Sequence, residues 1–140
     1  MGARIVRIGR SATGLGLFAA KPIAAGAYIA TYRGKRIATA EAHRRERTSG
    51  AKYMFEIDRR WSIDGSSRRN LGRYVNHSCE PNADAVLRAG RLIFVALRGI
   101  AVGEQITLDY GEEYFALYIR PLGCRCAACA KNRQKLPAPR

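Results

Sequence analysis

The sequence predicts a mostly β fold, built from many short strands with one small helix among them. Its apolar segments are short, and several alternate with polar residues, which is typical of strands with one buried face. Glycine and proline residues separate these segments at short intervals and indicate tight turns. A single longer segment has both the start and the stop signals of a helix.

The strands are expected along the whole chain. Residues 11–20 form a glycine-punctuated turn that leads into an apolar stretch, and Gly90 lies in a tight hairpin because glycine tolerates positive φ. Residues 112–122 are apolar and aromatic and indicate one or two helical turns. The expected strands are residues 4–8, 27–32, 53–57, 61–63, 83–87, 91–97 and 105–110.

The helix is expected over residues 39–50. Thr39 can act as its N-cap, and Glu41 in the first turn complements the positive end of the helix dipole. Gly50 can stop the helix, because a left-handed residue commonly follows a helix C-terminus. Several arginines lie toward this end, so the outer face of the helix would be basic.

Length and composition fit one soluble domain. The chain has 140 residues, of which 47% are hydrophobic and 26% charged. No apolar run approaches the length of about 20 residues that a membrane span needs, and the first residues lack the features of a secretory signal. The net charge of +14 favours anionic partners such as nucleic acid, although the basic residues are scattered and equally fit a solubilising surface.

The four cysteines predict a metal site. Three lie in the segment CRCAAC and the fourth follows His77 closely, in RYVNHSC. The pair His77 and Cys79 also fits a thiol nucleophile with its base, but such a hydrolase needs a third, orienting group. Four thiolates can complete the tetrahedral shell of a structural zinc, and none is left over. The expected ligands are Cys79, Cys124, Cys126 and Cys129.

Two further patterns are weaker when taken alone. Gly14 and Gly16 let a backbone approach a ligand closely, but they fit a simple turn equally well. Several tyrosines lie at strand ends or beside glycines, where their rings could line a narrow channel for an alkyl-ammonium group. These tyrosines are Tyr32, Tyr53, Tyr74 and Tyr110.

Together these segments resemble the SET-domain family of protein lysine methyltransferases. The resemblance runs from about Arg4 to Cys129, with the motifs in the order of the family. RYVNHSCEPNA is the most specific of them, and CRCAAC resembles the post-SET zinc cluster, which borrows Cys79. The remaining motifs are TGLGLFA (13–19), IATYRGK (29–35), KYMFEID (52–58), WSIDG (61–65) and LRGIAVGEQITLDYG (97–111).

The resemblance implies a compact fold of small β-sheets. The segment with Asn76 and His77 would be crossed by the segment with Tyr110 in a pseudoknot-like arrangement, a rare exception to unthreaded connections. No cysteine precedes Cys79, so we expect a minimal unit without the zinc cluster of a pre-SET region. The expected organisation is a SET domain over 1–111, a post-SET segment over 112–131 and a flexible tail over 132–140.

The resemblance also implies residue roles. S-adenosylmethionine would be the methyl donor, one zinc ion would be structural, and Tyr110 would be the catalytic tyrosine. The backbone of Gly14, Leu15 and Gly16 would approach the methionine end of the donor. The donor pocket would be completed by Tyr53, Arg73, Asn76 and His77. The lysine channel would be lined by Tyr32, Tyr74 and Leu108.

The chain departs from the family pattern at three points. Thr31 stands where a glutamate often precedes the tyrosine of the third strand, and the cysteine spacing is C-x-C-x2-C rather than C-x-C-x4-C. At the position of Leu108, family members that add one methyl group often have tyrosine, and those that add two or three often have phenylalanine. Leucine has no hydroxyl to hold a water that limits methylation, so we expect di- or trimethylation.

The predicted function is methylation of lysine side chains in a protein, such as a histone or another basic nucleoid or chromatin protein. Two alternatives are a catalytically weak binding module with the same fold and a basic zinc protein associated with nucleic acid. The second leaves the glycine and tyrosine motifs unexplained. We expect no membrane partner and an intracellular location in the cytoplasm, nucleus or nucleoid, with a secreted effector as the alternative. The basic surface also allows nonspecific contact with nucleic acid.

Overall fold

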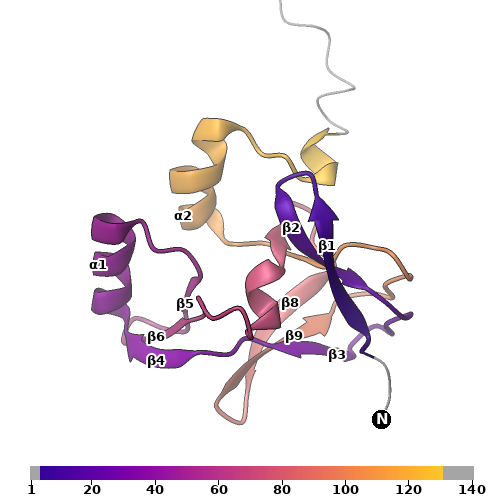
Figure 1. Ribbon diagram of the computed structural model, residues 1–140, viewed down its shortest axis with the longest axis horizontal. Coiled ribbons are helices and arrows are strands. Elements are labelled where there is room, and N and C mark those ends of the chain that lie inside the picture. The colour runs from indigo at the N-terminus through magenta and orange to yellow at the C-terminus, as the bar shows by residue number, and fades with distance from the viewer. Residues whose placement is uncertain (1–3, 131–140) are drawn as a thin grey trace, which may run out of the picture.

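The computed structural model describes residues 4–130, so the tail expected over 132–140 lies outside the described residues. Four small sheets surround one apolar core, as expected for a mostly β chain. Helix α1 (Thr39–Ser49) and the hairpin of β1 (Val6–Ser11) and β2 (Gly14–Ala19) lie on opposite sides of the view in Figure 1. The C-terminal helical segment from α2 (Glu112–Tyr114) lies above them.

The sheets are small and mostly antiparallel. Strands β1 and β2 form a sheet of their own, and a second two-stranded sheet pairs β7 with β10 in parallel. The two three-stranded sheets have the orders β3-β9-β8 and β4-β6-β5. The remaining bounds are β3 (Tyr28–Thr31), β4 (Lys35–Ala38), β5 (Met54–Glu56), β6 (Trp61–Asp64), β7 (Asn76–His77), β8 (Ala83–Arg88), β9 (Arg91–Ala96) and β10 (Thr107–Leu108).

Most of the expected strands are confirmed. The hairpin between β8 and β9 turns through Ala89 and Gly90, both with positive φ (51° and 76°), as a tight two-residue loop requires. The sequence pattern missed β4 and β7, which are short and find their partners far along the chain. It also missed β2, where residues 11–20 were expected to form a turn that leads into an apolar stretch. The strand expected over 105–110 is shorter in the structure: Gln105 forms an isolated bridge with Phe18, and only Thr107 and Leu108 form β10. The chain then turns at Asp109, whose carboxylate accepts the N–H of Gly111 (2.9 Å).

Helix α1 matches its expected bounds, but its expected cap is wrong. Gly50 is left-handed (φ 65°) and donates its N–H to the Arg45 carbonyl, which confirms the stop signal. Thr39 is the first helical residue and is 4% exposed, and Ala38 takes the N-cap position without a side-chain bond. The Thr39 hydroxyl donates instead to the Asp58 carbonyl (2.9 Å), which ties the helix start to the turn between β5 and β6.

The core joins all the sheets. Phe94, Leu17 and Ile106 are completely buried and come from β9, β2 and the segment before β10. Burial of such side chains contributes about 1.5–3 kcal/mol each, so the core holds these distant segments together. The expected helical turns over 112–122 are confirmed as α2, η2 (Phe115–Ile119) and η3 (Arg120–Leu122).

Candidate functional site

The site forms where two distant segments run side by side. Strand β10 pairs with β7 in parallel, with Thr107 opposite Asn76 and Leu108 opposite His77. Buried Asn82 holds the start of β10 in place, because its side-chain Oδ1 accepts the Thr107 N–H (2.9 Å) and its side-chain amide donates to the Gln105 carbonyl (2.8 Å). This pairing is what the family resemblance implies, and local sequence patterns do not indicate it.

The glycine motif lies against the asparagine of this crossing. The Asn76 amide nitrogen lies 3.0 Å from the Leu15 carbonyl, 2.8 Å from Gln105 Oε1 and 3.1 Å from Ser11 Oγ. A Cβ added at Gly16 would lie 2.6 Å from Gln105 Oε1, so a larger residue here would displace the Gln105 side chain from Asn76. The structure therefore brings Gly14, Leu15, Gly16 and Asn76 together, and it adds Ser11 and Gln105, which sequence reasoning missed.

His77 connects Tyr110 to the cysteine cluster. Its Nδ1 accepts the backbone N–H of Tyr110 (3.0 Å), and its Nε2 lies 3.4 Å from Cys79 Sγ. Burial lowers the pKa of His77, although nearby Asp109 opposes this shift. A neutral imidazole with its proton on Nε2 satisfies both contacts, because it accepts at Nδ1 and donates toward the sulfur.

Tyr110 directs its hydroxyl into the protein. The hydroxyl donates to the Val75 carbonyl, and the ring packs edge-on against Tyr114 (5.2 Å between centroids) and His77 (5.5 Å). Although 36% of the residue is exposed, burial of the phenol raises the pKa of Tyr110 well above its usual value. The phenol therefore stays protonated near neutral pH and acts as a hydrogen-bond donor rather than a base.

Tyr32 forms a buried wall beside the site. It is 5% exposed, packs against Phe55 (5.1 Å between centroids), and donates its hydroxyl to the Tyr53 carbonyl (2.5 Å). A Cβ at Gly65 would lie 2.4 Å from the Tyr32 ring, so this glycine lets the backbone close over the ring. Burial also raises the pKa of Tyr32.

Arg73 stacks on two of the predicted site tyrosines. Its guanidinium carbon lies 4.1 Å from the Tyr53 ring centroid and 5.3 Å from that of Tyr74. One of its terminal nitrogens donates to the Ser66 carbonyl, while its Nε is buried and has no partner among the described residues. Leu108 is 4% exposed and belongs to the apolar core at the end of β10.

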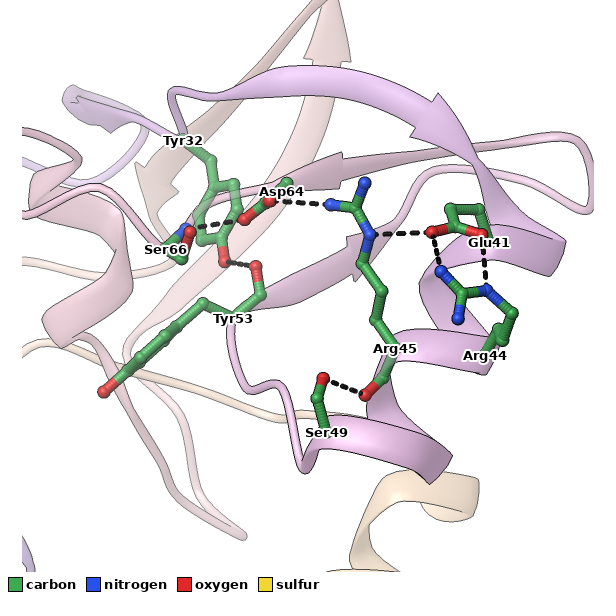
Figure 2. A network of polar contacts seen from close by, with 8 residues as sticks. All are labelled: Tyr32, Glu41, Arg44, Arg45, Ser49, Tyr53, Asp64 and Ser66. Carbon is green, nitrogen blue, oxygen red and sulfur yellow. Dashed lines mark hydrogen bonds and ion pairs between the residues drawn. The ribbon is translucent and has the colours of Figure 1, made fainter.

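A polar network connects helix α1 to the turn after β6, beside Tyr32 (Figure 2). Arg45 bonds both Glu41 (2.9 Å) and Asp64 (3.0 Å), and Asp64 accepts the N–H of Ser66 (3.0 Å). Hydrogen bonds from Arg44 and Arg45 lower the pKa of Glu41 to about 2. A carboxylate with a depressed pKa stabilises the fold at neutral pH and loses this contribution as the pH falls toward 2.

We expect Arg45→Met to loosen the turn that follows β6. The change removes both ion pairs of Arg45 and leaves Asp64 without its cation, so the melting temperature should fall by about 3 °C. Thermal unfolding followed by circular dichroism would measure this. Arg47→Met, at an exposed position of the same helix, is the matched control, and equal shifts for both variants would show that the network does not stabilise the turn.

The four cysteines converge as predicted. Their sulfur atoms all lie within 4.8 Å of one another, with 3.6 Å between Cys79 and Cys129 and 3.9 Å between Cys79 and Cys124. Tetrahedral zinc with Zn–S bonds near 2.3 Å places its sulfurs about 3.8 Å apart, so the donor set fits that ion. Burial opposes ionisation of Cys126, but backbone N–H groups of Cys79 and Cys129 donate to its sulfur and lower its pKa to about 6.

The shortened cysteine spacing is accommodated by a helical turn. The Ala130 N–H bonds the Cys126 carbonyl (2.9 Å), as in an α-helix. Residues three apart on a helix face the same side, so Cys126 and Cys129 present both sulfurs to the cluster. A small cavity of about 140 Å³ adjoins the cluster, and its lining includes His77, Asp109 and Phe115.

The comparisons with known proteins agree with this geometry. The family model described as "SET domain" matches residues 14–111. The chain belongs to the SET-domain family. It is 36% identical over 126 residues to "Histone-lysine N-methyltransferase trithorax" of Drosophila virilis, and 33% identical over 127 residues to "Histone-lysine N-methyltransferase EHMT1" of Homo sapiens. These alignments cover 84% and 82% of the chain but only 3% and 10% of those proteins.

A solved structure of the polycomb repressive complex 2 of Chaetomium thermophilum is also similar. The TM-score is 0.69 at 30% sequence identity, over 79% of this chain and 16% of that one. The chain therefore spans a small part of the relatives it matches. None of the helices in residues 4–130 has the length and apolar character of a membrane span.

Within this SET domain, the predicted residues form two connected groups. One group gathers the glycine motif, Asn76, His77 and Tyr110 around the β7–β10 crossing. The other stacks Arg73 with Tyr53 and Tyr74, and Tyr32 joins it through the Tyr53 carbonyl. Their individual roles in binding and catalysis stay predictions.

Proposed function

We propose that this SET domain transfers a methyl group from S-adenosylmethionine to the amine of a lysine side chain in a protein. The observation that carries the proposal is the crossing of β7 and β10, which places Tyr110 against His77 while Asn76 holds the glycine motif. The names of the relatives supply the reaction class. A basic zinc protein associated with nucleic acid does not require this arrangement. A binding module with the same fold would share the crossing, and the presence of Tyr110, Asn76 and His77 at it favours the enzyme.

The chain's own groups fit the needs of that reaction. The accepting lysine must lose its proton, although its usual pKa is about 10.4. A buried aromatic wall such as that of Tyr32 and Phe55 disfavours ammonium and therefore lowers this pKa. The protonated phenol of Tyr110 would orient the amine, so no dedicated base is needed and the proton leaves through water.

Three features fit the methyl donor, which supplies an electrophilic methyl group when bound. The backbone at Gly14 and Leu15 is exposed and would approach the methionine end, and the unpartnered Nε of Arg73 would bind its carboxylate. The cavity beside His77 and Phe115 would take an apolar, planar part of the donor. The ring of Tyr53, on which Arg73 stacks, would help to hold the Arg73 guanidinium in the donor pocket.

The four cysteines would hold one structural zinc ion. Zinc would attach the C-terminal helical segment to β7, because Cys79 lies just beyond that strand and the other three sulfurs come from the segment after η3. Reduced, metal-bound cysteines are typical of intracellular proteins. We therefore place the protein inside the cell, in the cytoplasm, nucleus or nucleoid.

The substrate would be a basic protein, a histone or another chromatin or nucleoid protein. The trithorax and EHMT1 relatives are named as histone-lysine methyltransferases, which supports this class. The net charge of +14 would also give weak, salt-dependent contact with nucleic acid near such a substrate. DNA binding whose affinity does not change with salt concentration would contradict this salt-dependent contact with nucleic acid.

The reaction is tested by donor binding and label transfer. Calorimetry should show that the protein binds S-adenosylmethionine. Donor labelled on its methyl group should then label lysines when it is incubated with a panel of basic proteins. A folded protein that binds no donor would overturn the proposal.

Leu108 gives a test of product state. We expect the wild type to form di- or trimethyllysine, because Leu108 has no hydroxyl to hold a water beside the acceptor. Leu108→Tyr should restrict the product to monomethyllysine, and Leu108→Met, with similar volume, should not. Intact-mass spectrometry of the substrate would measure the states. A wild type that forms only monomethyllysine would contradict the prediction.

A further inference from the structure

A second, larger hollow lies between the outer edge of the β1–β2 hairpin, strand β3 and the loop before η1 (Leu71–Tyr74). Its volume is about 500 Å³, and none of the residues of the donor and lysine sites lines it. Apolar side chains form part of it, including Ile8 and Tyr28, which are 42% and 50% exposed. We call this hollow the β1 groove.

The β1 groove carries a strong positive charge. Four arginines line it, and no acidic residue does. None of their guanidinium groups forms an ion pair with a carboxylate whose side chain the structure describes, whereas Arg44, Arg45, Arg98 and Arg120 are each paired with one. The four arginines of the β1 groove are Arg4, Arg33, Arg68 and Arg69.

One wall of the β1 groove is an open strand edge. Strand β1 pairs only with β2 in the described part of the chain. The Ile5 carbonyl accepts the Ala20 N–H, and in an antiparallel ladder bonded residues alternate, so the backbone groups of Val6 and Ile8 point away from β2. The bonds of Leu17, which lies opposite Ile8, show the same alternation. Its carbonyl points away from β1 and accepts the N–H of Ile106.

We propose that the β1 groove binds an acidic segment of a partner protein as an added β-strand. The segment would pair its backbone with Val6 and Ile8, place apolar side chains against Ile8 and Tyr28, and direct carboxylates to the arginines. Each contact uses a group that no described residue occupies. Bonds to an open edge supply affinity, and the arginines select for acidic sequence.

A peptide fits these observations better than a nucleic acid. Phosphate backbones bind broad basic surfaces and do not use the unpaired backbone groups of a strand. An extended acidic peptide uses the strand edge, the apolar side chains and the guanidinium groups together. The β1 groove is linked to the site indirectly, because Arg33 donates its backbone N–H to buried Asn70 (2.8 Å), which caps η1, the turn that contains Arg73.

The test uses a short fluorescein-labelled peptide of alternating valine and glutamate, with fluorescence anisotropy as the readout. The wild type should bind it saturably. Arg68→Glu with Arg69→Glu should weaken binding by about tenfold or more, since two favourable charge contacts become repulsive. Arg88→Glu with Arg91→Glu, an exposed pair on the β8–β9 hairpin with the same change in net charge, should stay within about twofold.

Further arms separate the β1 groove from general charge attraction. Arg33→Glu, on a different segment, should weaken binding even if the first double variant fails to fold. The same peptide with N-methyl groups on alternate amides should bind about tenfold more weakly, because it cannot pair along one edge. Equal weakening by both double variants, equal binding of the N-methylated peptide, or displacement by oligothymidylate in preference to unlabelled peptide would each overturn the proposal.

Discussion

Tyr110→Phe should lower the rate of methyl transfer by about 100-fold while the protein stays folded. The phenol of Tyr110 is the protonated donor at the crossing, and its hydroxyl contacts the Val75 carbonyl in the interior. Removing it deprives the amine of its orienting group and leaves that carbonyl without this donor. The second effect costs about 1–3 kcal/mol of stability and should appear as a lower melting temperature.

The matched control for this variant is Tyr28→Phe. Its hydroxyl contacts the Thr31 hydroxyl (2.8 Å) on the edge strand β3, outside the site, so label transfer should stay close to that of the wild type. Donor affinity, measured by calorimetry, should change little in either variant, because no contact joins the Tyr110 hydroxyl to the glycine motif. Unchanged label transfer by a folded Tyr110→Phe protein would show that the tyrosine is not catalytic.

The parts of the fold that could be predicted depend on local signals. The glycine at position 50 stops α1, and the positive φ of Gly90 turns the β8–β9 hairpin, because both requirements act within a few residues. The expected cap at Thr39 failed because burial against the sheet competes with capping, and its hydroxyl bonds Asp58 instead. Strand β4 went unnoticed because its pairing with β6 decides its conformation, not its own sequence.

The site could be predicted from motifs but not from geometry. The motif order indicated that Asn76 and Tyr110 belong together, yet no local pattern shows that Asn82 holds the start of β10 in place. Ser11 and Gln105 contact Asn76 from positions 65 and 29 residues away, and polar residues at turns carry no signal for such contacts. The convergence of the cysteines was predictable, because the chain has four of them and one tetrahedral zinc ion needs four ligands.

Cys79→Ser should release zinc and weaken donor binding together. Serine is a poor ligand for zinc, and structural zinc contributes about 10–16 kcal/mol of binding energy that is coupled to folding. Without the ion, the segment from α2 to Cys129 loses its attachment beside His77, whose Nε2 lies 3.4 Å from Cys79 Sγ. We expect zinc content to fall below equimolar, and donor affinity to fall by about tenfold or more, since the cavity at His77 and Phe115 is bounded by both segments.

The effect should be specific to the ligand rather than to the turn that carries it. Glu80→Gln changes the next residue, which is exposed, and should keep both zinc and donor affinity. A chelator added to the wild type should reproduce the loss seen in Cys79→Ser, and added zinc should restore the wild type but not the variant. If Cys79→Ser loses zinc and still binds the donor as tightly as the wild type, the cysteine cluster supports the C-terminal segment alone. The donor pocket would then depend only on the crossing of β7 and β10.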